Sequence, residues 1–176
     1  MTNIEAIFDS MPDRVPYEEH KSRNEKIFTP GYLAREMLDA LPNEVWNSKT
    51  TFLDPTCKSG VFLYEIYNRL MKSTSLIEEI PNPKDRREHI INKQLYGIAM
   101  DDTCKLISMR TVFGELRADG NIISFGANYM NIMQNEDKQF LYGYLTKEFN
   151  RMQFDVVIGN PPYNRGGGPR FCRFRI

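Results

Sequence analysis

The sequence has few of the residues that build metal sites and disulfide scaffolds. It contains three cysteines without paired spacing and two histidines, His20 and His89, which stand far apart. An odd number of unpaired cysteines is typical of a reducing compartment, so we expect a cytoplasmic protein without disulfides. Because the histidines are isolated, we also expect no metal site.

Long apolar runs and an excess of charge of one sign are also missing. No segment is apolar over the roughly 20 residues that a membrane helix needs, and the start lacks the basic and apolar pattern of a secretory signal. The 23 basic and 23 acidic residues cancel, whereas a protein that binds DNA usually presents a basic face. Four arginines follow Asn164 with no acidic residue among them, so the preceding body is acidic.

Strand-like and helix-like segments alternate along the chain. Of its 176 residues, 41% are hydrophobic, enough for one domain or part of one. We expect strands at 51–53, near 96–98, near 121–125 and at 154–158, and helices at 61–71, 102–114 and 138–152. Residues 73–92 are expected to form a connection followed by a charged helical segment. This order predicts an α/β fold with parallel strands and right-handed crossovers.

The most informative segment is Phe154-Asp155-Val156-Val157-Ile158-Gly159 followed by Asn160-Pro161-Pro162-Tyr163. The prolines end the apolar strand and stiffen the backbone, at the strand end where open α/β sheets bind ligands. The Asn160 side-chain oxygen and a carbonyl of the proline pair could accept hydrogen bonds from an adenine amino group. Tyr163 could stack on the base. The alternative is a stiff loop without a ligand.

A second signal follows the expected strand at 51–53. Asp54-Pro55-Thr56-Cys57-Lys58-Ser59-Gly60 leads into a segment with apolar residues at helical spacing. A strand, a tight loop and a helix place the helix N-terminus beside a ligand. Asp54 could accept a hydrogen bond from an ammonium group, and Gly60 could let a ligand approach the backbone closely. An ordinary turn is the alternative.

Together, these segments resemble the adenine-N6 DNA methyltransferases that use S-adenosylmethionine, and in particular the methylase part of restriction-modification enzymes. The donor loop of that family is similar to Asp-Pro-x-Cys-Gly-Ser-Gly-x-Phe-Leu, which residues 54–63 match except at Lys58. The tetrad at 160–163 matches the catalytic Asn-Pro-Pro-Tyr fully. Lys58 replaces a glycine of the family, which we interpret as a trait of a subgroup.

Thr29 and Pro30 fit a Thr-Pro that precedes the donor loop in this family and begins an amphipathic helix. Thr29 is expected to cap this helix, and Pro30 is expected to occupy its first turn. The helix should then carry one apolar face. We expect that face to consist of Leu33, Met37, Leu38 and Leu41.

The resemblance implies a Rossmann-like methyltransferase fold, here with a partial parallel sheet and flanking helices. The implied reaction transfers a methyl group from S-adenosylmethionine to adenine N6 in DNA. The implied catalytic residues are Asn160, Pro161, Pro162 and Tyr163. The implied donor-binding residues are Thr29, Pro30, Asp54, Pro55, Thr56, Gly60, Phe62, Asp101 and Asn128. Of these, Asn128 would contact the donor's adenine amino group.

One position departs from the family in the second strand. Ala99 stands where an acidic residue usually binds the ribose hydroxyls of the donor. Asp101 or Asp102 could take that role. Both could equally begin the next helix, and this second interpretation is favoured by their place directly after the strand.

The resemblance also predicts the domain organisation. We expect a polar arm at 1–27, a partial methyltransferase domain at 28–164 and an irregular basic tail at 165–176. The family sheet has seven strands and only the first four are recognised here, so we interpret the chain as a truncated methylase without a target-recognition region. Its fourth strand would then have an open edge that favours self-association.

Two other functions stay open at this point. Methyltransferases that act on protein glutamine or on RNA can share the Asn-Pro-Pro-Tyr tetrad. The chain could also be a non-catalytic interaction fragment, inactive in isolation.

Overall fold

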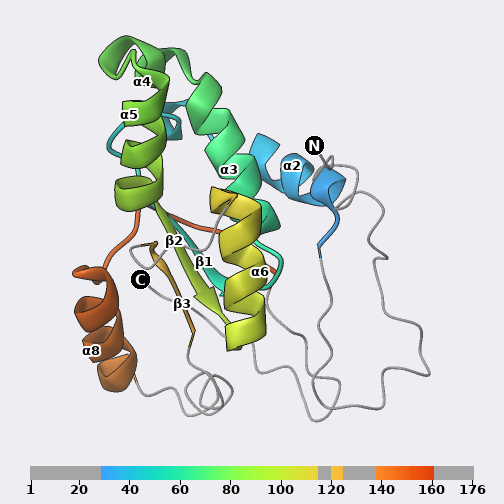
Figure 1. Cartoon of the computed structure of the whole chain (residues 1–176), viewed down its shortest axis with the longest axis vertical. Helices are drawn as coiled ribbons and strands as arrows, with labels where there is room; N and C mark the ends of the chain where they lie inside the picture. Colours follow the sequence, from blue (N-terminus) through green and yellow to red (C-terminus); the bar gives the residue numbers. More distant parts are fainter. Residues whose placement is uncertain (1–28, 115–119, 125–137, 161–176) are drawn as a thin grey trace.

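A computed structural model describes residues 29–114, 120–124 and 138–160. Its strands form one parallel sheet in the order β3-β2-β1-β4. The strands are β1 (Phe52–Cys57), β2 (Leu95–Ala99), β3 (Ile122–Ser124) and β4 (Val156–Val157). Helices lie on both sides of the sheet (Figure 1). The predicted α/β, Rossmann-like architecture is therefore confirmed, whereas the expected arm at 1–27 and tail at 165–176 lie outside the described residues.

Alternation along the strands divides the core into two layers. Phe52, Leu95 and Ile122 point to one face, where they pack with residues of α2 (Gly31–Asp39), α3 (Val61–Lys72) and α6 (Asp102–Phe113). Their neighbours Leu53, Tyr96 and Ile123 point to the other face, which α8 (Lys138–Phe149) covers (Figure 1). A parallel sheet that is covered on both faces leaves the ends of its strands as the place for a site.

Two strand boundaries differ from the expected ones. β1 extends through Asp54 to Cys57, but its register against β2 shifts between these two residues. Pro55 has no N–H to donate and the N–H of Thr56 donates to the Asp54 side chain, so the ladder is interrupted there. β4 is limited to Val156–Val157, although the N–H groups of Asp155 and Ile158 still donate to carbonyls of Thr51 and Leu53.

The helix after Thr29 and Pro30 begins later than expected. Pro30, with an extended backbone at φ −61° and ψ 149°, is the N-cap of α2, and no side chain caps this helix. The prediction that Thr29 caps it was wrong. The helix buries Gly31, Ala34 and Leu38, and Met37 is 37% exposed, so the expected apolar face was only partly right. Ala34 of that face packs against Val61 and Phe62 of α3, and Met37 lies outside the face.

The connection between α3 and β2 is more structured than expected. It comprises α4 (Thr74–Glu79), α5 (Pro83–His89) and a π-helical turn, η3 (Ile90–Gln94), and a short 3-10 helix, η2 (Asn43–Val45), precedes β1. Asn82 caps α5 by accepting from the Lys84 N–H, and Pro83 occupies the first position of this helix. α8 ends at Phe149 rather than at 152, because Asn150 adopts a left-handed conformation at φ 53°.

None of the described helices is both long enough and apolar enough to cross a membrane. The described residues also contain no group of three or more histidine, cysteine or acidic side chains that could hold a metal ion.

Candidate active site

The loops that follow β1 and β4 lie against each other at the carboxyl end of the sheet. Gly159 rests directly on the carboxyl half of β1: a Cβ atom at this position would lie 2.6 Å from Asp54 Oδ1 and 2.9 Å from Thr56 Oγ1. Only a residue without a side chain permits this approach. The start of the second predicted motif therefore lies against the first, although the two are more than 100 residues apart in the sequence.

Asn160 is held at both its side chain and its main chain. Its Nδ2 donates to Thr29 Oγ1 at 3.3 Å, and its carbonyl oxygen accepts from Lys58 Nζ at 3.3 Å. Thr29 precedes α2, Lys58 follows β1 and Asn160 follows β4. Three separate segments thus meet at the residue that sequence analysis placed at the centre of the chemistry.

Asp54 is a buried carboxyl group at the end of β1. It is 3% exposed, and its Oδ1 accepts from the N–H of Thr56 at 3.0 Å and from Thr56 Oγ1 at 3.4 Å. Burial raises the pKa of Asp54 from 3.8 to about 7, although the hydrogen bonds from Thr56 and the charge of Lys58 act to lower it. Near neutral pH Asp54 is therefore divided between its neutral acid and its carboxylate.

Lys58 places an ammonium group close to that carboxyl. The residue is 7% exposed, and burial lowers its pKa while the charge of Asp54 raises it. The main-chain carbonyl of Lys58 accepts a hydrogen bond from Ser108 Oγ of α6 at 3.2 Å, which fixes the loop below. Sequence analysis treated Lys58 only as a departure from the family pattern and missed its contact with Asn160.

Gly60 and Phe62 have clear structural roles. Gly60 is left-handed at φ +81° and is the N-cap of α3. A Cβ there would lie 3.0 Å from the Ser108 Cα atom and 3.1 Å from Val112 Cγ2, so this side of Gly60 packs closely on α6. Phe62 is 2% exposed and packs with Ala34 and Val61 between α2 and α3.

The structure supports the helix-start interpretation of the acidic pair after β2. Asp101 is the N-cap of α6 and accepts from the Cys104 N–H at 2.8 Å. Asp102 lies in the first turn and accepts a hydrogen bond from the Ser124 hydroxyl. Ala99 is fully buried at the end of β2. Asn128, Pro161, Pro162 and Tyr163 lie outside the described residues.

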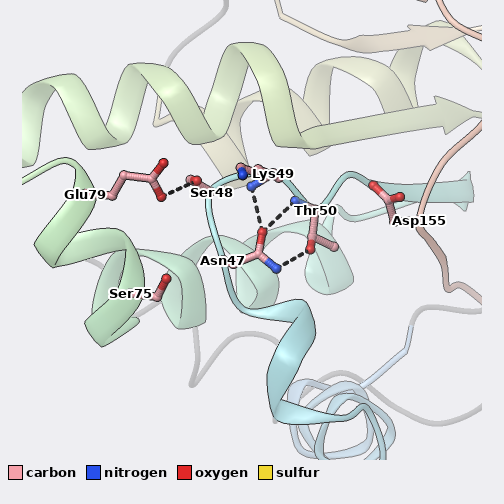
Figure 2. A pocket seen from close by; sticks show the side chains of 7 residues that line it. All are labelled: Asn47, Ser48, Lys49, Thr50, Ser75, Glu79 and Asp155. Atoms are coloured by element: carbon pink, nitrogen blue, oxygen red, sulfur yellow. Dashed lines mark hydrogen bonds between the residues drawn. The ribbon is translucent and has the colours of Figure 1, made fainter.

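A polar pocket of about 360 Å³ lies at the opposite end of the sheet (Figure 2). Its lining residues are Asn47, Ser48, Lys49, Thr50, Ser75, Glu79 and Asp155. Asn47 Oδ1 accepts from the N–H groups of Lys49 and Thr50, and Asn47 Nδ2 donates to Thr50 Oγ1 at 2.9 Å. The Ser48 hydroxyl donates to Glu79. These bonds fix the turn that leads into β1, so the polar groups of this pocket serve the fold.

Comparison with known proteins gives two matches. Residues 93–169 match the family model described as Eco57I restriction-modification methylase, which includes β2, β4 and the tetrad. A protein of Mycoplasma pneumoniae named "Uncharacterized adenine-specific methylase" is 28% identical over 202 residues, which cover 82% of this chain and 47% of that protein. Over these residues the chain is similar to restriction-modification methylases. The predicted resemblance is thereby confirmed, and methylases of this family require a methyl donor.

The matched methylase relative is much longer than the aligned part. The chain spans about half the length of the curated relative. The family match begins after the donor loop, so Asp54, Lys58 and Gly60 lie outside it. The roles of these three residues are supported by the geometry described above.

Proposed function

We propose that this chain carries the donor-binding and catalytic core of a DNA methyltransferase that transfers a methyl group from S-adenosylmethionine to adenine N6, within a restriction-modification system. The observation that carries this proposal is the contact between Gly159 and Asp54, which brings Asn160 beside the donor loop. The family match and the adenine-specific relative support it.

Asn160 supplies the hydrogen-bond acceptor that the reaction needs. The amino group of adenine is a weak nucleophile because its lone pair is delocalised into the ring. Acceptance of one amino hydrogen by Asn160 Oδ1, and of the other by a carbonyl of the Pro161-Pro162 segment, would hold the nitrogen and favour its pyramidal form. Tyr163 would stack on the flipped base. The proton leaves the methylated nitrogen to water after the transfer.

The charges at the β1 loop fit the amino-acid end of S-adenosylmethionine. A buried carboxyl whose pKa is raised to about 7 gains stability as a carboxylate when an ammonium group binds beside it. Asp54 would therefore hold the donor ammonium, and Lys58 carries the charge that suits the donor carboxylate. When bound, the sulfonium supplies an activated methyl group. The other proposed donor contacts are Pro30, Pro55, Thr56, Gly60, Phe62, Asp101 and Asn128. Thr29, which the resemblance also implies, contacts Asn160 instead.

The side chains of some proposed contacts are already engaged by the protein. Phe62 is in the core and Asp101 caps α6. In our proposal, Phe62 therefore supports the donor loop from below. Asp101 lies close to the end of β2, where the ribose is bound in the family. Its proposed contact with the donor depends on that resemblance.

The proposal is tested in two steps. Calorimetric titration of the chain with S-adenosylmethionine measures donor binding, and transfer of a labelled methyl group to unmethylated DNA measures the reaction. Asn160→Ala should retain donor binding and lower transfer at least about 100-fold, because it removes the acceptor of the amino hydrogen. Transfer to DNA by Asn160→Ala at the wild-type rate would refute the role of Asn160.

Two other outcomes favour the alternative functions. Methyl transfer to protein glutamine or to RNA, with none to DNA, would favour a related amino-methyltransferase. Donor binding without any transfer would favour a non-catalytic fragment.

We further propose that the chain acts in the cytoplasm and can self-associate through β4. Cys57 and Cys104 are buried free thiols, as suits a reducing compartment. β4 is the edge strand of the described sheet, and an apolar edge strand offers unpaired backbone groups to another chain. Light scattering over a range of protein concentrations tests this: a constant monomer mass would contradict self-association.

A further inference from the structure

We propose that Thr29 is a positioning residue that sets the orientation of the Asn160 side-chain amide. The resemblance assigned Thr29 to the donor, and its contact with Asn160 gives it a different role. This inference rests on the proposed function, because it concerns the amide that would accept the hydrogen of the adenine amino group.

The geometry gives Thr29 this position. Its side chain is buried at 5% exposure, and its hydroxyl oxygen lies 3.3 Å from Asn160 Nδ2. The hydroxyl takes no part in capping α2, because the N-cap is Pro30 and this helix has no side-chain cap. The Thr29 hydroxyl is buried directly before α2 and does not cap this helix. It contacts Asn160, which lies 131 positions away in the sequence.

The orientation of the amide decides whether Asn160 can act. A carboxamide presents an oxygen that only accepts and an NH₂ group that only donates, and the two ends have nearly the same shape. The contact of Nδ2 with Thr29 directs Oδ1 away from Thr29. An adenine amino group is a donor, so the opposite orientation would place one NH₂ group against another.

The Asn160 main chain is fixed independently. Lys58 Nζ donates to the Asn160 carbonyl, and Gly159 rests on Asp54. With the backbone held in this way, the side-chain torsions are the freedom that remains, and the terminal torsion has a broad and nearly two-fold profile. In the arrangement that the structure shows, the Thr29 hydroxyl accepts from Nδ2, and this bond biases the torsion toward the orientation that leaves Oδ1 free.

Two substitutions separate the hydroxyl from the shape of the side chain. Thr29→Val keeps the volume and removes the hydroxyl, and Thr29→Ser keeps the hydroxyl and removes a methyl group. At saturating S-adenosylmethionine we expect Thr29→Val to lower the rate of methyl transfer about 10-fold, since one hydrogen bond that orients the acceptor is lost. Thr29→Ser should restore most of that rate, and the donor Kd of Thr29→Val should stay within about 2-fold of wild type.

Kinetic results of the opposite kind would overturn the inference. A weaker donor affinity of Thr29→Val, with an unchanged rate at saturation, would make Thr29 a donor-binding residue. Equal rates for wild type and Thr29→Val would show that the hydroxyl has no role. Circular dichroism and thermal melts of both variants identify any loss that comes from unfolding.

A second measurement does not depend on activity. In protein labelled with ¹⁵N-asparagine, the side-chain NH₂ signals of Asn160 are those that vanish in Asn160→Asp. These signals should shift in Thr29→Val and remain near their wild-type positions in Thr29→Ser. Unchanged Asn160 signals in Thr29→Val would refute the inference even if the wild-type chain transfers no methyl group, whereas absent transfer with the expected shifts would refute only the proposed function.

Discussion

The two ends of the parallel sheet use buried polar groups in opposite ways. At the amino end, Gln94 is fully buried and its Nε2 donates to the carbonyls of Asn47 and Thr50. At the carboxyl end, burial displaces the pKa of Asp54 upward and that of Lys58 downward. The first arrangement satisfies backbone groups and stabilises the turn before β1. The arrangement at the carboxyl end leaves the charged forms of Asp54 and Lys58 disfavoured by burial, so a bound ligand of suitable charge could stabilise them. Displaced pKa values of this kind are typical of functional sites.

The contact between the two loops is the part of the carboxyl end that is most sensitive to substitution. In Gly159→Ala the added Cβ would meet Asp54 Oδ1 at 2.6 Å, so the β4 loop or the Asp54 side chain must shift. We expect methyl transfer to fall about 100-fold, because a shift of about 1 Å in a catalytic group has effects of this size. The measurement is transfer at saturating donor.

Gly143→Ala is the matched control for that substitution. Gly143 lies in α8, is exposed, and a Cβ there would meet nothing within 4 Å. Its replacement should leave the rate unchanged and stabilise the helix by about 1 kcal/mol. Equal rates for both glycine variants would show that the close approach of the two loops is irrelevant to the reaction.

Gln94→Leu should destabilise the amino end of the sheet without changing methyl transfer at the carboxyl end. The substitution leaves the carbonyls of Asn47 and Thr50 buried without their donor, which we expect to lower the free energy of unfolding by about 2 kcal/mol. The loss is moderated because Gln94 Oε1 is itself buried and has no partner among the described residues. Urea unfolding measures the change. A transfer rate per folded molecule that falls together with stability would contradict the division between the two ends.

Asp54→Asn should change how the stability of the protein depends on pH. The folded-state pKa of Asp54 is raised from 3.8 to about 7, so its contribution to stability is fully present below pH 3.8 and is lost as the pH rises toward 7. The loss amounts to at most about 4 kcal/mol. Asp54→Asn should remove this decline from a series of urea melts. A decline of equal size in the variant would mean that another group causes it.

The same variant tests donor binding. At a pH above 7, where wild-type Asp54 is ionised, we expect Asp54→Asn to weaken S-adenosylmethionine binding about 10-fold, since an ion pair becomes a neutral hydrogen bond. The difference should shrink as the pH falls below 7. Calorimetry at two pH values measures it, and a constant ratio of the two affinities would remove Asp54 from the donor site.

Asp155→Asn should have the smallest effect. Asp155 Oδ2 accepts from both the N–H and the hydroxyl of Thr51 at 2.8 Å, which lowers the pKa of Asp155. This stabilisation is present above the ordinary pKa of 3.8 and is lost as the pH falls through the lower folded-state value. We expect a loss of about 1 kcal/mol at neutral pH, from urea unfolding. A loss of donor affinity in this variant would link the two ends of the sheet.

Much of the fold was predictable because its signals are local. The apolar runs that became β1, β2 and β3 and the helices that became α3 and α6 were found near their observed bounds. The prediction was less accurate where side chains compete with the backbone. Thr29 was expected to cap α2 but contacts Asn160 instead, and the turn η3 had no local signal that separates a π-helical turn from an α-helix.

The sequence by itself determined the resemblance to a family and the two motifs. The order of Asp54, Gly60 and Asn160 is a property of the chain, and the apolar run before Gly159 predicts a strand wherever it packs. Only the tertiary structure decided which residues meet. Thr29, Lys58 and Asn160 are brought together by three segments that the parallel sheet and α2 place side by side. The physical reason is that hydrogen bonds and burial depend on distance in space, and no local pattern in a sequence records the partner of a side chain that lies 131 residues away.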